Sequence, residues 1–524
     1  MNSKNDYINA LSAFISPQNN HLKYENFFSE VLNQFLDIQG EKPPKYEEIS
    51  EKMWEIFDEV KEARRFNETY IGHMLSEACI PGMLGYLLSI RLGSNTVARE
   101  VSIQETKLEK EAIDGLIDII GYDKNTASGT FTSGGSIACL TALAVARKKL
   151  FYEYTRQSLK RPEKIAVITT RLAHYSFLKS ISLLGGIWED DCQIKIAMLP
   201  HEGFKIPLDK LENTIIDLKN KNIPIMAIYA IAGETETGLV DPLDDIAEIA
   251  LKHEIFTIAD GAYGAPYKLS GIAGKHFVGL EKYDVVTLDG HKALYTPYSN
   301  GSVLFKNAED HYLLNLGVRA AYINMGDGKN PNDLNNKEAI EKLRKGDDNL
   351  GSKRLEGSSG AGAILSTLAV LRLLGKEGLK AIYDYTIERT HYLYQRIEES
   401  SVFSNLHKPE LNLLCFQLKN FSEIYKKYFN NDKDRYRVFV NETREELDKN
   451  IINDGGYFLS TTDLPIDYNI DSDYFLFEKN ISQSYESLPA CWRACIMHPR
   501  TSDEILDKAI GNLELLVETK LMDL

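Results

Sequence analysis

The sequence predicts an α/β protein with a mainly parallel sheet. Along the middle of the chain, short runs rich in β-branched residues alternate with stretches of helical spacing. The chain has 524 residues, 43% of them hydrophobic and 10% aromatic, which is enough for a large buried core in two or three domains. We therefore expect one large sheet domain with smaller parts before and after it.

The part of the chain before the sheet is predicted to be helical. Residues 1–105 carry spaced aromatic anchors, namely Trp54, Phe57, Phe66 and Tyr70. A helix is predicted over 102–123 from apolar residues that recur at helical spacing, namely Leu108, Ala112, Leu116, Ile119 and Ile120. We expect three parts: an N-terminal helical segment (1–105), a large domain (106–390) and a small C-terminal α+β domain (391–524).

Five strands are predicted in the large domain, at 164–170, 223–232, 255–260, 284–289 and 302–306. A predicted helix at 243–254 lies between two of them, as parallel pairing requires. The polar stretch 307–353 is predicted to be a mobile loop. From about residue 357 a helical pattern leads to a terminal helix, with strands expected on the way at 412–418, 456–461 and 491–498.

Acidic residues outnumber basic ones by 76 to 60, so the formal net charge is −16. A charge of this sign argues against general binding of nucleic acid or of anionic membranes. No apolar run is long enough to span a bilayer, and the N-terminus lacks the basic start and apolar run of a signal peptide. We expect a cytoplasmic protein with neither kind of partner.

The six cysteines are scattered and contain no CxxC pair, which is typical of a reducing compartment. Cys491 and Cys495 are four residues apart, a spacing that would place them on one face of a helix. We interpret them as small buried hydrophobic residues rather than metal ligands, and no metal site is predicted.

The segment 129–147, GTFTSGGSIACLTALAVAR, has the composition of a phosphate-binding turn. A strand, a Gly-Gly-Ser turn and a helix would present backbone N–H groups with a partial positive charge to an anion. Gly135 and Ser136 are the candidate residues. An ordinary turn in which Ser136 caps the helix is the alternative.

Three further candidate residues follow predicted strands. Lys292, in TLDGHKAL, could attack a carbonyl if it lies in a pocket, although an isolated His-Lys pair is more often a surface feature. Asp260 ends a strand in IFTIADGAYGAP and, if buried, needs a cationic partner; a turn Asp that caps the next segment is the alternative. His174 follows a strand in TTRLAHYS, where a lone His is usually structural.

Taken in order, the phosphate turn, His, Asp and Lys resemble the layout of a fold-type I enzyme of pyridoxal 5′-phosphate (PLP). Over roughly residues 50–500 the chain is similar to the group II PLP-dependent amino-acid decarboxylases. Their TSGGSEAN-like, GTTEGAVDP-like, DAAYGG and DPHK segments stand here as TSGGSIAC, GETETGLVDP, DGAYGA and DGHK. Two upstream stretches, YIGHMLSEACIPGMLGYLLS and SNTVAREVSIQETKLE, also resemble family segments. The resemblance implies a large domain with a mainly parallel seven-stranded sheet.

The resemblance also implies roles for individual residues. Lys292 would hold PLP as a Schiff base, and Asp260 would pair with the pyridine nitrogen and keep it protonated, so that the ring can withdraw electrons. Ala262 would pack on one face of the ring, and His174 would stack on the other. The reaction implied is loss of CO₂ from an amino acid, followed by return of a proton to Cα.

Two more functions follow from the same resemblance. Gly135, Ser136 and His291 would hold the phosphate. A loop tyrosine about thirty residues after the Lys is implicated in returning the proton, and Tyr322 in RAAYINMGDG fits that position. The alternatives are that Tyr322 only packs the base of the loop, or that Tyr312 takes the role.

Several positions depart from the family pattern. Glu234 stands where Thr or Ser is usual, so a second carboxylate either alters the electrostatics near the cofactor or points away from it. Gly290 replaces a Pro, which predicts a looser turn before Lys292. Ile258 replaces a His two residues before Asp260, and Ser359 stands at a usually basic position.

The stretches HKALYTPYSNG, AAYIN and EGSSGAGA resemble bacterial tyrosine decarboxylases, so we expect an aromatic substrate, tyrosine or dihydroxyphenylalanine. The enzymatic alternatives are decarboxylation of an acidic amino acid such as glutamate or aspartate, or aldehyde synthesis, against which Tyr322 argues. A catalytically degenerate binding protein is the non-enzymatic alternative, against which Lys292 and Asp260 argue. The resemblance also implies a homodimer with its active site at the interface.

Overall fold

The computed structural model describes residues 66–185, 193–315, 350–449, 456–464 and 489–524. Its larger sheet has seven strands in the order β1-β7-β6-β5-β4-β2-β3. These are β1 (Ser128–Thr132), β2 (Ile165–Thr170), β3 (Ile194–Leu199), β4 (Ile225–Ile231), β5 (Thr257–Asp260), β6 (Val285–Asp289) and β7 (Gly301–Phe305). β6, β5, β4, β2 and β3 are parallel neighbours, whereas β7 is antiparallel to β1 and β6. The predicted seven-stranded, mainly parallel sheet is confirmed.

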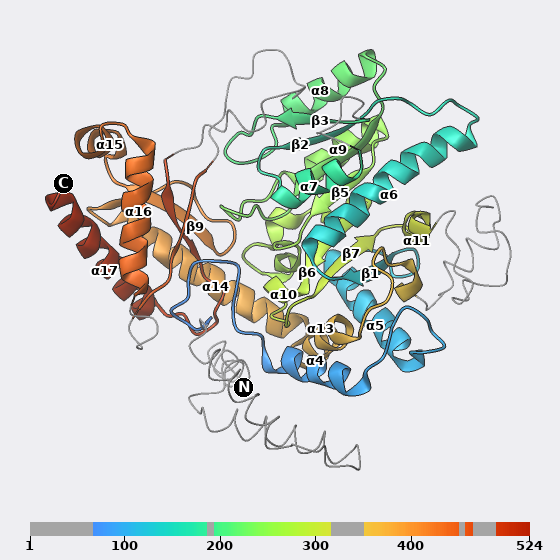
Figure 1. Ribbon diagram of the computed structural model, residues 1–524, viewed down its shortest axis with the longest axis horizontal. Helices are drawn as coiled ribbons and strands as arrows, with labels where there is room; N and C mark the ends of the chain where they lie inside the picture. The colour runs from blue at the N-terminus through green and yellow to red at the C-terminus, as the bar shows by residue number, and fades with distance from the viewer. Residues whose placement is uncertain (1–65, 186–192, 316–349, 450–455, 465–488) are drawn as a thin grey trace, which may run out of the picture.

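Helices cover both faces of this sheet (Figure 1). One face packs on α6 (Gly135–Arg156) and α7 (Tyr175–Leu183). The other packs on α5 (Ile103–Ile120), α8 (Leu208–Asn220), α9 (Leu243–His253) and α13 (Gly362–Leu373). Because side chains alternate along a strand, Val167 of β2 belongs to the first core and Ile168 to the second. Both faces are therefore buried, as a parallel sheet requires.

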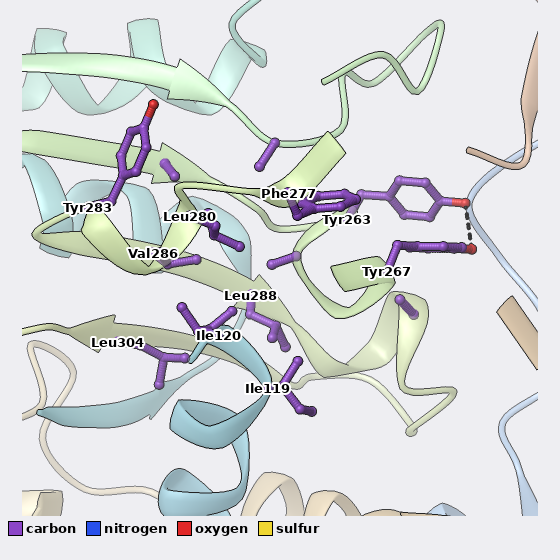
Figure 2. Close-up of a cluster of buried hydrophobic side chains, with 14 of the residues drawn as sticks. Ile119, Ile120, Tyr263, Tyr267, Phe277, Leu280, Tyr283, Val286, Leu288 and Leu304 are labelled. Atoms are coloured by element: carbon purple, nitrogen blue, oxygen red, sulfur yellow. Dashed lines mark hydrogen bonds between the residues drawn. The ribbon is translucent and has the colours of Figure 1, made fainter. Parts of the chain in front are cut away.

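Figure 2 shows part of the second core, where β6, β7 and α5 meet the segment after β5. Apolar side chains from the strands, such as Val286 and Leu304, pack beside Ile120 of α5. The tyrosines in this cluster keep their hydroxyls bonded: Tyr283 donates to the Leu243 carbonyl at 3.2 Å. The cluster holds β6 in place through Val286 and Leu288. The candidate residue Lys292 lies in the turn directly after β6.

A second sheet lies at one end of the molecule, away from the first (Figure 1). It has four strands in the order β10-β11-β9-β8, namely β8 (Phe403–Asn405), β9 (Leu413–Leu418), β10 (Ser460–Thr462) and β11 (Cys491–Cys495). Its helices are α14 (Gly375–Glu398), α15 (Phe421–Phe429), α16 (Lys433–Asp448) and α17 (Asp503–Met522). The predicted domain boundary at 390 falls inside α14, and the boundaries stay a prediction.

Some predicted elements differ from the structure. Cys491 and Cys495 lie on β11, which confirms the strand predicted at 491–498 and not the helical spacing, and both are buried as predicted. The strand predicted at 456–461 is only the short β10. Part of the predicted loop is helical, since α11 (Ala308–Tyr312) follows β7. In the predicted N-terminal helical segment, 66–79 is irregular and α4 (Ile80–Leu92) is helical; Trp54 and Phe57 lie outside the described residues. None of the described helices is long and apolar enough to cross a membrane.

His311 in α11 is a buried ionisable group at the edge of the sheet where the parallel strand β6 begins. Its ring stacks on Phe305 with the centroids 4.7 Å apart, and its Nδ1 lies 2.9 Å from the Ser128 hydroxyl. Burial lowers the pKa of His311 well below its ordinary value, because a charged imidazole would lose its hydration there. The folded protein therefore holds His311 neutral at a pH where the unfolded chain would protonate it.

We predict that His311 makes the free energy of unfolding depend on pH. Below about pH 6.5 the unfolded chain binds a proton at this position and the folded chain does not. Stability should therefore fall by about 1.4 kcal/mol per pH unit as the pH drops below that value. Urea unfolding between pH 5 and 7, compared with His311→Asn, measures this contribution. Equal pH slopes for the two proteins would contradict it.

Candidate active site

The turn between β1 and α6 forms an anion cradle. α6 begins at Gly135, and its N-cap residue Gly134 has φ 154° and makes no side-chain cap. The first N–H groups of the helix thus face the cavity without a capping oxygen. A Cβ on Gly135 would lie 2.6 Å from Oδ2 of Asp289, so only glycine permits this approach. Ser136 follows in the first turn of the helix.

Lys292 lies in α10 (Gly290–Ala293), a short turn at the carboxyl end of β6. Its Nζ is 3.1 Å from Oδ2 of Asp289, whose side chain is 3% exposed. Nε2 of His291 lies 3.6 Å from the same oxygen. Burial lowers the pKa of His291, which favours the neutral ring. Asp289 is therefore the carboxylate that offsets the charge of Lys292.

The turn that carries Lys292 is not loosened by Gly290, contrary to the prediction. A Cβ on Gly290 would meet the Asn300 side chain at 2.8 Å. The Thr296 N–H donates to the Gly290 carbonyl at 3.2 Å, and the His291 N–H donates to the Asn300 carbonyl at 3.2 Å. Glycine here permits close packing against Asn300, and the two backbone hydrogen bonds keep the turn in one conformation.

Asp260 ends β5, the strand next to β6, and is 9% exposed. Its Oδ1 accepts from the Ala262 N–H at 3.2 Å and from the Thr287 hydroxyl at 3.1 Å. Its Oδ2 accepts from the Tyr229 hydroxyl at 2.6 Å. All three donors are neutral, so a cation that enters the cavity is still needed to offset the charge of the carboxylate.

His174 lies between β2 and α7 and caps the helix. Its Nδ1 accepts from the Ser176 N–H at 3.4 Å and lies 2.9 Å from the Ser176 hydroxyl. The ring of Tyr175 lies 4.2 Å away, centroid to centroid. Burial lowers the pKa of His174, chiefly because the charged ring would be desolvated. The contacts of Nδ1 with Ser176 thus hold the imidazole in one orientation.

These side chains line one cavity of about 370 Å³ at the carboxyl ends of the parallel strands. Ligands of α/β sheets bind at this edge. The structure brings together seven of the residues predicted from the sequence, namely Gly135, Ser136, His174, Asp260, Ala262, His291 and Lys292.

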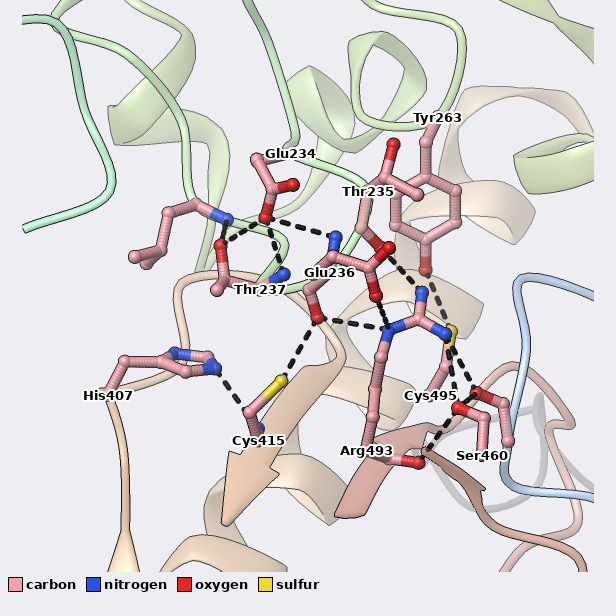
Figure 3. A network of polar contacts seen from close by, with 12 residues as sticks. Glu234, Thr235, Glu236, Thr237, Tyr263, His407, Cys415, Ser460, Arg493 and Cys495 are labelled. Atoms are coloured by element: carbon pink, nitrogen blue, oxygen red, sulfur yellow. Dashed lines mark hydrogen bonds and ion pairs between the residues drawn. The ribbon is translucent and has the colours of Figure 1, made fainter. Parts of the chain in front are cut away.

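Two predicted tyrosines and Glu234 are not part of this group. Tyr322 lies outside the described residues. Tyr312, at the end of α11, is not among the described residues that line the cavity. The Glu234 carboxylate points away, since it accepts from the Glu236 N–H and from the N–H and hydroxyl of Thr237, as Figure 3 shows. Burial raises the pKa of Glu234.

The segment that contains Ser359 lies beside the anion cradle. Its contacts include those of the Ser359 carbonyl and the Glu356 side chain. The Ser359 carbonyl accepts from the N–H and the hydroxyl of Thr96, both at 2.9 Å. The carboxylate of Glu356 accepts from the Ser133 N–H at 3.1 Å, next to the phosphate turn. These bonds fix the segment that follows residues 316–349 against the cradle.

Sequence reasoning missed several residues at or behind the cavity wall. Asp289 could have been found, because it ends a predicted strand three residues before Lys292. Met74 and Tyr298 line the cavity from YIGHMLSEACIPGMLGYLLS and HKALYTPYSNG, two stretches that resemble family segments, but neither residue was assigned to the site. Tyr229 lies inside an apolar strand, where the sequence offers no signal that its hydroxyl reaches a carboxylate.

The residues present fit a phosphorylated, cationic aromatic aldehyde. The uncapped helix N-terminus suits a phosphate, the Asp260 carboxylate lacks a cation, and Lys292 is a primary amine in the same cavity. A sheet of this topology with Lys, Asp and a glycine turn at its strand ends defines a fold-type I PLP-dependent enzyme.

Comparison with known proteins makes this assignment narrower. The chain belongs to the family described as the pyridoxal-dependent decarboxylase conserved domain, which matches residues 40–419. It is 30% identical to an aspartate 1-decarboxylase of Aliivibrio fischeri over 420 residues, which are 75% of this chain and 71% of that protein. An L-tyrosine/L-aspartate decarboxylase of Methanocaldococcus jannaschii is 28% identical over 72% of this chain and 87% of its own.

Solved structures share the fold. Mouse CSAD in its apo form has a TM-score of 0.70 at 18% identity and covers 98% of both chains. Oryza sativa TDC with PLP and tryptamine has a TM-score of 0.72 at 14% identity and covers 99% of this chain and 96% of that one. The protein is thus a PLP-dependent amino-acid decarboxylase, a carboxy-lyase, rather than a degenerate binding protein.

We predict that Gly135→Ala weakens PLP binding about tenfold, because overpacking costs about 1–3 kcal/mol where the new Cβ meets Asp289. Spectrophotometric titration of the apoprotein with PLP measures the change. Gly511→Ala in α17 is the matched control, since a Cβ there meets nothing within 4 Å. An unchanged affinity in Gly135→Ala would remove this turn from the phosphate site.

Proposed function

We propose that the protein decarboxylates an aromatic L-amino acid, tyrosine or dihydroxyphenylalanine, to its amine and CO₂. The observation that carries this is the lining of the cavity. Apart from glycines, Thr235 and the polar groups already described, its wall is apolar or aromatic: Met74, Ile137, Leu172, Tyr175, Ile231, Tyr263 and Tyr298. Among the described lining residues, Lys292 is the only Lys or Arg, and its amine is needed for the cofactor. An uncharged ring suits this lining better than a second carboxylate does.

In this proposal the chain holds PLP at four points. The N–H groups at Gly135 and Ser136, with His291, bind the phosphate, and Nζ of Lys292 binds the carbonyl carbon covalently. When bound, PLP supplies a ring that accepts the electron pair released as the bond from Cα to the carboxylate breaks.

Other residues contact the two faces of the PLP ring and its nitrogen. His174 and Ala262 confine its two faces, which orients the substrate bond that breaks. Asp260 keeps a proton on the ring nitrogen, since its carboxylate lacks another cation among the described residues.

Two groups are proposed to move or hold protons. Asp289 lies 3.1 Å from Nζ of Lys292. It would stabilise the protonated Lys292 amine when the substrate amine replaces that amine on the cofactor. Tyr322 returns a proton to Cα, which yields an amine and not an aldehyde; this role comes from its place in the sequence.

An acidic substrate is the second candidate, favoured by the aspartate decarboxylases among the relatives. One cation beside the cavity wall is Arg493, which donates to the carbonyl of Thr235, a lining residue, at 2.5 Å. Its Nε lies 3.4 Å from a Glu236 carboxylate oxygen (Figure 3). Because this guanidinium is already paired, an acidic side chain would have to compete for it.

We predict at least about tenfold higher kcat/KM for tyrosine or dihydroxyphenylalanine than for aspartate, glutamate or cysteine sulfinate. Release of CO₂ and chromatography of the amine measure both the preference and the product. Lys292→Ala is the control and should lose turnover and the visible absorbance of bound PLP. Preference for aspartate would overturn the aromatic assignment, and an aldehyde product would overturn the role of Tyr322.

We further propose a homodimer, supported by an apolar face on α4. This helix buries its small residues, since Gly85 packs against the Leu365 backbone. Its large residues face outward, with Leu88 60% and Ile90 58% exposed. A helix that hides glycine and exposes leucine is typical of an interface. A second copy of the chain is the occupant we assign, with the site near the contact.

Leu88→Asp should weaken the dimer by about 2 kcal/mol or more, because a charge would enter an apolar contact. Sedimentation equilibrium over a range of concentrations measures this. Leu251→Asp on α9 is the matched control, since that leucine is 74% exposed on another surface and should leave the mass unchanged. A wild-type protein that sediments as a monomer would contradict the proposal.

A cytoplasmic location is also proposed. Five cysteines in the described part of the chain are free thiols, and all five are buried. Such thiols are typical of a reducing compartment.

A further inference from the structure

A chain of buried hydrogen bonds lies behind Asp260, on the side away from the cavity. The Tyr229 hydroxyl lies 2.6 Å from Oδ2 of Asp260 and 3.3 Å from Sγ of Cys139. Tyr229 comes from the middle of β4 and Cys139 from the first turns of α6. Both are buried, and neither lines the cavity. The mechanism described so far uses neither residue.

The directions of these hydrogen bonds follow from the protonation states. Burial raises the pKa of Cys139 to about 12 and that of Tyr229 well above its ordinary value, so both keep their protons. An ionised Asp260 can only accept, and therefore the phenol donates to it. The oxygen of Tyr229 is then free to accept from the thiol. The result is a relay from Cys139 through Tyr229 to Asp260.

The surroundings keep the phenol in place. Its ring packs on Phe177 with centroids 4.8 Å apart, and its backbone carbonyl accepts from the Thr169 hydroxyl at 2.9 Å. On the other side, Thr287 of β6 holds Oδ1 of Asp260 at 3.1 Å. Each carboxylate oxygen thus has a donor from a strand that flanks β5, and the carboxylate cannot rotate without losing one of them.

The neighbouring side chain on β5 cannot replace this support. Ile258, two residues before Asp260, lies on the same strand but has no polar atom in its side chain. The TSGGSIAC segment ends on Cys139 where the family segment carries Asn. The support of the carboxylate is therefore built here from a phenol and a thiol.

We propose that Tyr229, backed by Cys139, is a positioning residue that orients the Asp260 carboxylate and sets how strongly it keeps the ring nitrogen of PLP protonated. This rests on the role proposed above for Asp260. Hydrogen bonds to a carboxylate favour its charged form. Without the phenol the carboxylate is more basic, so the proton shifts from the ring nitrogen toward Asp260 and the ring withdraws electrons less.

The test is nitrogen NMR of the holoenzyme, reconstituted with PLP that carries ¹⁵N in the ring. Tyr229→Phe should move the ring-nitrogen signal toward that of unprotonated pyridine and lower kcat about tenfold, the loss typical of a hydrogen bond to a charged group. Tyr283→Phe is the matched control, because it also removes one buried hydroxyl, which donates to the Leu243 carbonyl. Its signal should match the wild type.

Asp260→Asn separates this inference from the proposed function. If that variant leaves the signal unchanged, Asp260 does not pair with the ring and its proposed role fails. If Asp260→Asn moves the signal and Tyr229→Phe does not, the relay alone is overturned. Cys139→Ala gives a second route should Tyr229→Phe not fold: it should move the signal the same way by a smaller amount, and an unchanged signal would again overturn the relay.

Discussion

Parallel pairing of β4, β5 and β6 is the constraint on which the site depends. In this register Ile231 lies opposite Asp260, and Asp260 lies opposite Thr287. β4 and β5 therefore end at one level, β6 continues past them to Asp289, and the turns after all three open on one edge of the sheet. The cradle of α6 reaches the same edge because β1 joins the sheet through β7. No single segment of the chain contains this site.

Burial of acidic groups at this edge is what shapes its chemistry. Four buried carboxylates of the described residues lie there or close by, and their hydrogen-bond partners differ. Asp241 accepts from the N–H groups of Ile206 and Ile231, and Glu234 caps its own turn. Asp289 faces Lys292. Of these four, only Asp260 both lines the cavity and accepts hydrogen bonds from neutral donors alone. Its charge can therefore be offset by a cationic ligand.

Stability and function draw on the same interactions. The apolar clusters on both faces hold the strands. The buried pair of Glu109 with Arg354, whose side chains are 0% and 1% exposed, ties α5 to the segment that begins at residue 350. Breaking such a pair would leave an unpaired buried charge. The pair therefore fixes the position of the segment that carries Arg354. The cradle and the segment around Glu356 are consequently held against each other.

The sequence by itself determined every strand of the large sheet except β3, the family and the seven residues that meet in the cavity, because these depend on local periodicity and on motifs of contiguous residues. One of its errors was local: Gly290 packs closely instead of loosening a turn. Only the tertiary structure decided that Glu234 turns away and that Tyr229 reaches Asp260. Those contacts depend on which strands become neighbours and on which face each side chain lies, and no short stretch of sequence carries that information.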